Sequence, residues 1–154
     1  GVTFATNPQG ADHTAGLAYA ANILGLGGVV DPLSVAGQAE LSRRTQILAA
    51  AVDALGLCAF VSFAFFENPK AASAVVDMLN ARFDWRLTQE DFDSLGQKVL
   101  SMETGFNRRA GLTEASDRLP EFFADEAVGP DQATFDVPAE ELDRVLRFDG
   151  NGGL

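Results

Sequence analysis

The chain has 154 residues, of which 47% are hydrophobic and 21% charged, a composition typical of soluble globular proteins and unlike that of disordered chains. We therefore expect one folded domain over residues 1–154. Because 22 Asp and Glu outnumber 11 Lys and Arg, the formal net charge is −11, which disfavours nucleic acids and anionic membrane surfaces as partners.

The N-terminal third is predicted to form two helices. Apolar residues recur at spacings of three and four without sustained two-residue alternation, which predicts an all-α, irregular multi-helix domain. We expect a first helix over residues 14–24, with Asp12 or Thr14 as its cap. Residues 35–55 are predicted to form the longest core helix, and Gly56 is placed to close it in a left-handed conformation.

The apolar run at residues 55–66 is too short to span a bilayer, which takes about 20 residues, so no membrane segment is predicted. The chain starts without a basic region ahead of an apolar one, so we expect no signal peptide and a cytoplasmic location. Cys58 is the only cysteine. It can form neither an intramolecular disulfide nor a complete cysteine-based metal site, and composition alone favours a buried hydrophobe.

The second half of the chain is predicted to contain three more helices and one long connection. Asn68-Pro69 marks the start of a helix to residue 83. Thr88 and Asp91 form a capping-box pattern that starts another helix, ending near Gly111. Residues 112–138 are predicted to be a surface connection with little regular structure, followed by a helix over 139–148. The residues expected in the core are Val75, Val76, Leu79, Phe83, Phe92, Leu95, Val99, Met102 and Phe106.

His13, the only histidine, stands in a glycine-bounded segment, residues 10–16, at the expected start of the first helix. A helix dipole would favour neutral imidazole there, and neutral imidazole can both donate and accept a proton. This makes His13 a candidate catalytic residue. A capping or surface residue is the alternative interpretation.

A second cluster combines Asp53, Gly56 and Cys58 at the expected end of the long helix. A carboxylate is disfavoured at a helix C-terminus, so Asp53 there favours a cationic or multiply donating partner, such as an amino-pterin ring. An ordinary capped helix end is the alternative interpretation of this pattern.

Residues 53–58 resemble the Asp-x-x-Gly-Leu-Cys motif of the aldehyde ferredoxin oxidoreductases, a family of tungsten-pterin enzymes. Residues 6–16 also resemble that family around its histidine. Residues 106–111 and 117–123 resemble its Phe-Asn-x-Arg-x-Gly and Asp-x-Leu-Pro signature, in the same order. Three separated motifs in register are more specific than any one of them.

The resemblance implies the C-terminal helical domain, about the last third, of a larger enzyme. That enzyme would oxidise a small aldehyde to a carboxylic acid at a tungsten or molybdenum bis-pterin and pass electrons through a 4Fe-4S cluster to ferredoxin. By resemblance, Asp53, Gly56 and Leu57 would hold pterin, Cys58 would be a cluster ligand, and His13 would be the proton donor. Upstream domains of the same subunit would supply three cluster cysteines, so both cofactor sites are incomplete here and the chain would be inactive alone. A homo-oligomer is compatible with this interpretation.

The C-terminal end departs from the family pattern. After residues 140–146 the family usually continues with a Tyr-Tyr pair and an Arg-Gly-Trp stretch, whereas Arg147 and Phe148 here lead into a glycine-rich tail. A metal-free all-α scaffold or protein-interaction domain is the competing hypothesis. The particular aldehyde and the choice of metal do not follow from the sequence.

Overall fold

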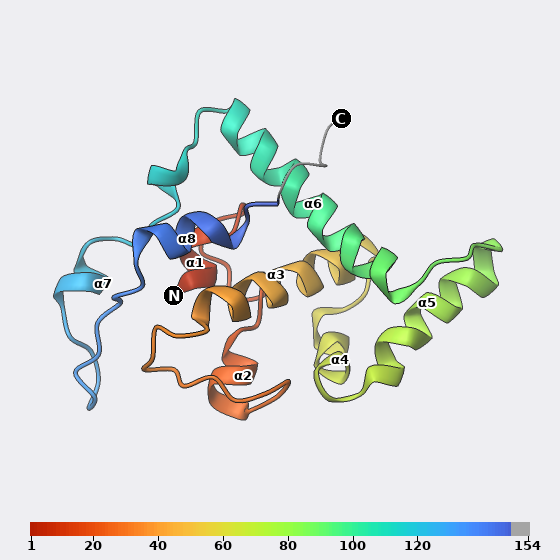
Figure 1. Ribbon diagram of the computed structural model, residues 1–154, viewed down its shortest axis with the longest axis horizontal. Coiled ribbons are helices and arrows are strands. Elements are labelled where there is room, and N and C mark those ends of the chain that lie inside the picture. The colour runs from red at the N-terminus through yellow and green to blue at the C-terminus, as the bar shows by residue number, and fades with distance from the viewer. Residues whose placement is uncertain (149–154) are drawn as a thin grey trace.

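The computed structural model describes residues 1–148, without the side chains at positions 66, 67, 69 and 72, so the predicted extension of the domain to residue 154 lies outside the described residues. Within the described range the chain is helical and contains no β-strand, apart from one isolated bridge between Val128 and Ala133 (Figure 1). The all-α prediction is confirmed. The helices are α1 (Val2–Thr6), α2 (Tyr19–Leu24), α3 (Gln38–Ala54), α4 (Phe63–Glu67), α5 (Pro69–Phe83), α6 (Gln89–Arg109), α7 (Phe122–Asp125) and α8 (Ala139–Val145), with 3-10 turns η1 (Ala59–Ser62) and η2 (Glu114–Ser116).

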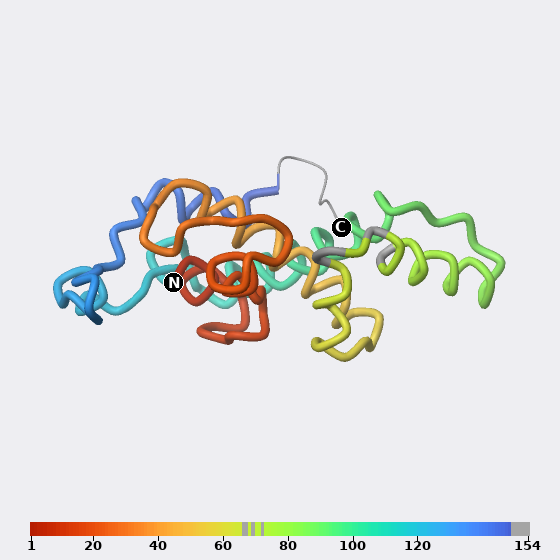
Figure 2. Tube along the Cα trace, turned by 90° about the horizontal axis from the view of Figure 1, so that it is seen from below, coloured from red at the N-terminus to blue at the C-terminus, as the bar shows by residue number. Residues whose placement is uncertain are grey.

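Helices α3 and α6 pack against each other and form the frame of the molecule (Figure 1). Their close approach depends on Gly96, because a Cβ atom at that position would overlap the carbonyl oxygen of Ile47. Seen from below, the chain forms a long, shallow body in which α5 projects at one end and the segment around α7 at the other (Figure 2). The two long helices therefore connect distant parts of the fold.

The apolar core is divided between two clusters along α3. One cluster joins the C-terminal half of α3 to α5 and to the start of α6, and the other joins α1 to α8. Burial of these side chains provides the main driving force for folding. The buried members are Ala51, Val52, Val75, Val76 and Phe92 in the first cluster, and Val2, Ala5, Leu142 and Val145 in the second.

The first predicted helix is much shorter than expected, and α1 was not predicted at all. Asp12 does not cap a helix. Instead, its carboxylate accepts hydrogen bonds from the backbone and hydroxyl groups of Thr14 at 2.9 Å, which stabilises a turn. Leu17 has φ of 39°, a left-handed conformation that interrupts any helix there. Helix α2 therefore begins only at Tyr19 and ends, as predicted, before left-handed Gly25.

The predicted core stripe of α6 is buried only at its start. Phe92 is 5% exposed, but Met102 is 52% and Phe106 is 66% exposed, so their assignment to the core is wrong. The buried row is Phe92, Gly96 and Leu100, at a spacing of four. This row packs against α3, in place of the predicted stripe, because the absence of a side chain at Gly96 lets α3 approach along it. Phe83, also predicted to point inward, is 48% exposed and stacks on Trp85.

The predicted caps of α5 and α6 are confirmed. The side chain of Asn68 accepts a hydrogen bond from the backbone N–H of Lys70, and Thr88 and Asp91 form a reciprocal capping box. The long connection has only η2, α7 and the isolated bridge as regular structure, as predicted. The last helix ends at Val145, three residues earlier than expected.

Candidate functional site

A tight turn at the C-terminal end of α3 carries the residues predicted to meet the cofactors. Gly56 has φ of 69°, a conformation that glycine adopts without steric cost. Its N–H donates to the carbonyl oxygen of Asp53 at 2.9 Å, and the N–H of Leu57 donates to that of Val52 at 3.0 Å. This pair of bonds is a Schellman motif, which ends the helix and turns the chain. Asp53 and Cys58 consequently lie at opposite ends of one short turn.

Asp53 is an exposed carboxylate in acidic surroundings. None of the residues described by the structure donates a hydrogen bond to its side chain or forms an ion pair with it. Partial burial, reinforced by the negative charge of Asp12, raises the pKa of Asp53 above its ordinary value. Burial also raises the pKa of Glu103, with a further contribution from the charge of Asp53. An unpaired acceptor among like charges is stabilised by N–H donors or by a cation.

Cys58 lies on the surface, which corrects the expectation from composition that it is a buried hydrophobe. Its backbone is extended, with φ of −68° and ψ of 133°, between the Gly56 turn and η1. Leu57 anchors the turn by packing against the first apolar cluster, whereas Phe60 beyond Cys58 is 80% exposed. Over residues 1–148, no three His, Cys, Asp or Glu side chains are grouped so that they could hold a metal ion.

His13 lies in the loop before α2 and not at a helix start, so the dipole argument for its neutral form is wrong. Its side chain is 76% exposed, with Nδ1 at 3.7 Å from a carboxylate oxygen of Asp12. Hydrogen bonds from the backbone and then the hydroxyl of Thr14 lower the pKa of Asp12, and His13 adds a smaller effect. The charge of Asp12 also contributes to the raised pKa of Asp53.

A buried polar network, which the sequence analysis missed, fixes the start of this loop against α3. Gln46 is fully buried, and its Nε2 donates to the hydroxyls of Thr6 and Ser42, both at 3.0 Å. Its Oε1 accepts from Asn7 Nδ2 at 3.1 Å, while Asn7 Oδ1 accepts from the N–H of Gln9 at 2.9 Å. The available signal was the pair Ser42 and Gln46, which are polar residues four apart on the predicted core helix.

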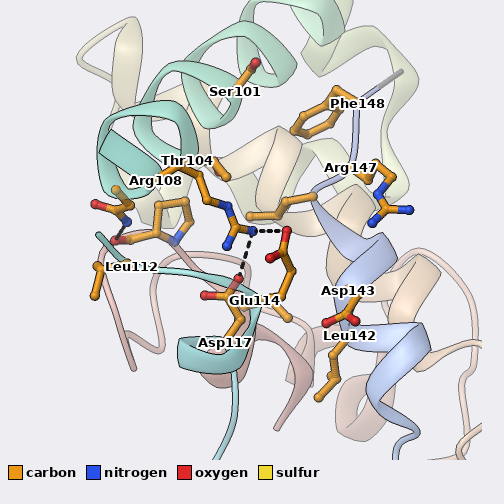
Figure 3. A pocket seen from close by; sticks show the side chains of 14 residues that line it. Ser101, Thr104, Arg108, Leu112, Glu114, Asp117, Leu142, Asp143, Arg147 and Phe148 are labelled. Carbon is orange, nitrogen blue, oxygen red and sulfur yellow. Dashed lines mark hydrogen bonds and ion pairs between the residues drawn. The ribbon is translucent and has the colours of Figure 1, made fainter. Parts of the chain in front are cut away.

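The Phe-Asn-x-Arg-x-Gly signature makes structural contacts. Asn107 Nδ2 donates to the carbonyl oxygen of Pro8 at 2.8 Å and so holds the histidine loop from the side of α6. Arg108 Nη2 lies 3.0 Å from a carboxylate oxygen of Glu114 and 3.5 Å from one of Asp117, beside a cavity of about 240 Å³ (Figure 3). Burial raises the pKa of Asp117, although Arg108 opposes the shift. Asn107 of the signature and Arg108, which occupies its variable position, thus tie the end of α6 to both flanking segments.

His13 is one of the residues that line a groove of about 400 Å³. Leu17, Tyr19 and Val137 also line it, and its lining is largely apolar. A small molecule in this groove would therefore contact apolar side chains as well as the imidazole of His13.

None of the helices in the described part of the chain is long and apolar enough to cross a membrane. The family described as "Aldehyde ferredoxin oxidoreductase, domains 2 & 3" matches residues 1–148. The chain is 32% identical over 154 residues to the tungsten-containing aldehyde ferredoxin oxidoreductases of Thermococcus kodakarensis and Pyrococcus furiosus, and 30% identical to that of Pyrococcus horikoshii. These matches cover 97% of this chain but only 24 to 25% of the relatives' length.

The fold and the turn after α3 define an all-α domain that presents a carboxylate and a thiol at one helix end. The chain belongs to the aldehyde ferredoxin oxidoreductase family.

Proposed function

We propose that the polypeptide to which this chain belongs oxidises a small aldehyde to a carboxylic acid. The reaction consumes one water molecule and releases two protons and two electrons. A 4Fe-4S cluster, with Cys58 as one ligand, would supply the route for these electrons to ferredoxin. A tungsten bis-pterin, or its molybdenum counterpart, supplies the two-electron redox chemistry when bound. The relatives are named as tungsten-containing enzymes of this activity, which supports the proposal.

The observation that carries the proposal is the unpaired carboxylate of Asp53. An amino-pterin ring offers several N–H donors, and Asp53 has exposed acceptor oxygens that bind no described residue. Partial burial and, to a smaller extent, the negative charge of Asp12 raise its pKa, as expected of a carboxylate that no described residue pairs with. The residues present therefore fit the group: Asp53 would accept from the pterin, and the backbone of Leu57, held by the Gly56 turn, would orient it.

Cys58 would be a ligand of the cluster. Its thiol is exposed at the far side of the same turn, and thiolate is the usual ligand of cluster iron. Because this chain has a single cysteine, the remaining ligands would come from other parts of the polypeptide. Asp53 and Cys58 are only five positions apart, so the pterin and the cluster that they would hold would lie next to each other.

His13 would hold or move a proton at its imidazole. The groove that His13 helps to line has apolar walls suited to the carbon chain of an aldehyde. Asp12 lies next to His13, and its charge contributes to the raised pKa of Asp53, which supports a proton carrier in the neighbourhood of the proposed pterin contact. Neutral imidazole can accept a proton released in the reaction and give it to water.

The test is replacement of Cys58 by Ala in the whole polypeptide. We expect the variant to lose most of its cluster iron, because an alanine side chain offers no ligand. Ala54→Ser, four residues earlier on an exposed position of the same helix end, is the matched control and should keep its iron. Normal iron content in the Cys58 variant would remove the cluster assignment and, with it, the proposed path for electrons.

A further inference from the structure

The C-terminal half of α6 carries an apolar surface that nothing in the described chain covers. Met102 and Phe106 are 52% and 66% exposed, although they continue the stripe whose first member, Phe92, is 5% exposed. Residues four apart on a helix lie one above the other, so the two side chains form one patch. In Figure 1 this half of α6 reaches the upper edge of the molecule, away from α5.

The patch is one wall of a groove of about 290 Å³. The opposite wall is Pro8 and Gln9, and Glu103 and Asn107 complete the lining. The groove has a fixed width at one end, because Asn107 Nδ2 donates to the carbonyl oxygen of Pro8. The wall formed by Pro8 and Gln9 is also held at Gln9, because its N–H donates to Asn7 Oδ1 in the buried network. A groove with two anchored walls can accept a side chain without rearrangement.

We propose that a segment of the same polypeptide, lying outside these 154 residues, packs an apolar side chain into this groove. The chain spans only 25% of the length of its relatives, so most of such a polypeptide is available to cover it. The inference rests on the longer enzyme proposed above. It adds a specific contact between this domain and the rest of the subunit, at the C-terminal half of α6.

The carboxylate of Glu103 in the groove indicates which polar group the incoming segment carries. Glu103 is half-buried at the groove and forms no hydrogen bond or ion pair with any residue from 1 to 148 whose side chain the structure describes. Burial of this carboxylate is stabilised by a Lys, an Arg or a backbone N–H on the incoming segment. A second copy of this chain fits less well, because each copy has a net charge of −11. A polar pterin fits the apolar wall of Met102 and Phe106 poorly.

The first measurement is the oxidation rate of the Met102 thioether in the native whole polypeptide, compared with its rate after denaturation. Covering the groove should slow oxidation by at least about fivefold. Free N-acetylmethionine added to both samples verifies that the oxidant dose is equal in both states. Protection of Met102 by less than this factor would overturn the proposal. So would protection that disappears on dilution or on removal of the cofactors, because the occupant would then be a second copy or the pterin.

The second measurement compares Phe106→Glu with Phe106→Leu in the whole polypeptide. A buried glutamate next to Glu103 should open the contact and remove the protection of Met102, whereas leucine should keep it. Unchanged protection in Phe106→Glu would contradict the proposal. If that variant does not fold, the wild-type protection measured above still decides.

Metal content separates this inference from the proposed function. Protected Met102 in a polypeptide that binds neither tungsten, molybdenum nor iron would keep the groove contact and reject the enzyme. Unprotected Met102 in a polypeptide that does bind these metals would reject the groove contact and keep the proposed enzyme.

Discussion

Asn107 Nδ2 donates a hydrogen bond of 2.8 Å to the carbonyl oxygen of Pro8, a residue 99 positions earlier in the chain. Pro8 begins the loop that leads to His13, and Asn107 lies near the end of α6. The position of the proposed proton carrier therefore depends on a helix that is remote in sequence. Gln46 supports the same loop from α3 through Asn7.

Asn107→Asp should slow aldehyde oxidation without loss of iron. The substitution keeps the side-chain shape but replaces the donor by a carboxylate oxygen, which repels the Pro8 carbonyl and displaces the loop. Small displacements of a positioned group commonly cost about tenfold to a hundredfold in rate. Gln97→Glu, the same change at an exposed position of α6, is the control. An unchanged turnover number would show that the loop does not position a reacting group.

Asp53→Asn should stabilise the cofactor-free polypeptide while weakening pterin retention. Because the folded pKa of Asp53 is raised, its contribution to stability is fully present below the ordinary value of 3.8 and is lost as pH rises through the folded pKa. Asparagine stays neutral, so the variant should resist urea better than wild type near pH 7. The difference should close below about pH 3.8. A variant less stable at neutral pH would indicate a stabilising role for the carboxylate that the structure does not show.

Local sequence signals predicted the caps of α5 and α6 and the end of α3, but not the packing between helices. The Asn68 and Thr88 caps and the Gly56 turn each depend on a few adjacent residues, and all three are found. Met102 and Phe106 were placed in the core because periodicity identifies an apolar face without saying whether a partner covers it. The row that packs is set by Gly96, and a glycine adds nothing to a hydrophobic pattern.

In the candidate site, too, the sequence predicted only the features that adjacent residues determine. The turn from Asp53 to Cys58 follows from glycine chemistry at a helix end, as the residue pattern indicated. The loop of His13 did not form the expected helix, because Asp12 bonded to Thr14 and made a turn. The bonds of Gln46 and Asn107 join residues about 40 and 99 positions apart, and no short pattern encodes such pairs.

Gly96→Ala should lower the free energy of unfolding by about 1 to 3 kcal/mol, because the new methyl group would force α6 away from Ile47. Gly105→Ala, on the same helix, is the matched control. Its Cβ would lie 3.6 Å from Arg109 Nη1, an ordinary contact, so better helix propensity should stabilise by up to about 1 kcal/mol. Urea unfolding of both variants measures the difference. Equal effects would mean that α3 and α6 do not approach at Gly96.

Gly56→Ala should destabilise by about 1 to 2 kcal/mol through backbone strain alone. The position has φ of 69°, and a Cβ atom there would meet no other atom within 4 Å. Gly56→Asn should cost less, since asparagine tolerates the left-handed region better than alanine. Thermal unfolding distinguishes the two variants. A neutral alanine substitution would show that the turn between Asp53 and Cys58 is not left-handed in solution.

In the proposed function, this chain contributes Asp53 and Cys58 to a metal-pterin and iron-sulfur enzyme. Its most direct test is elemental analysis for tungsten, molybdenum and iron on the whole native polypeptide, purified without oxygen from its own host. We expect tungsten or molybdenum together with about four iron atoms per chain. A folded polypeptide with neither pterin metal nor iron would contradict it and would favour the metal-free scaffold.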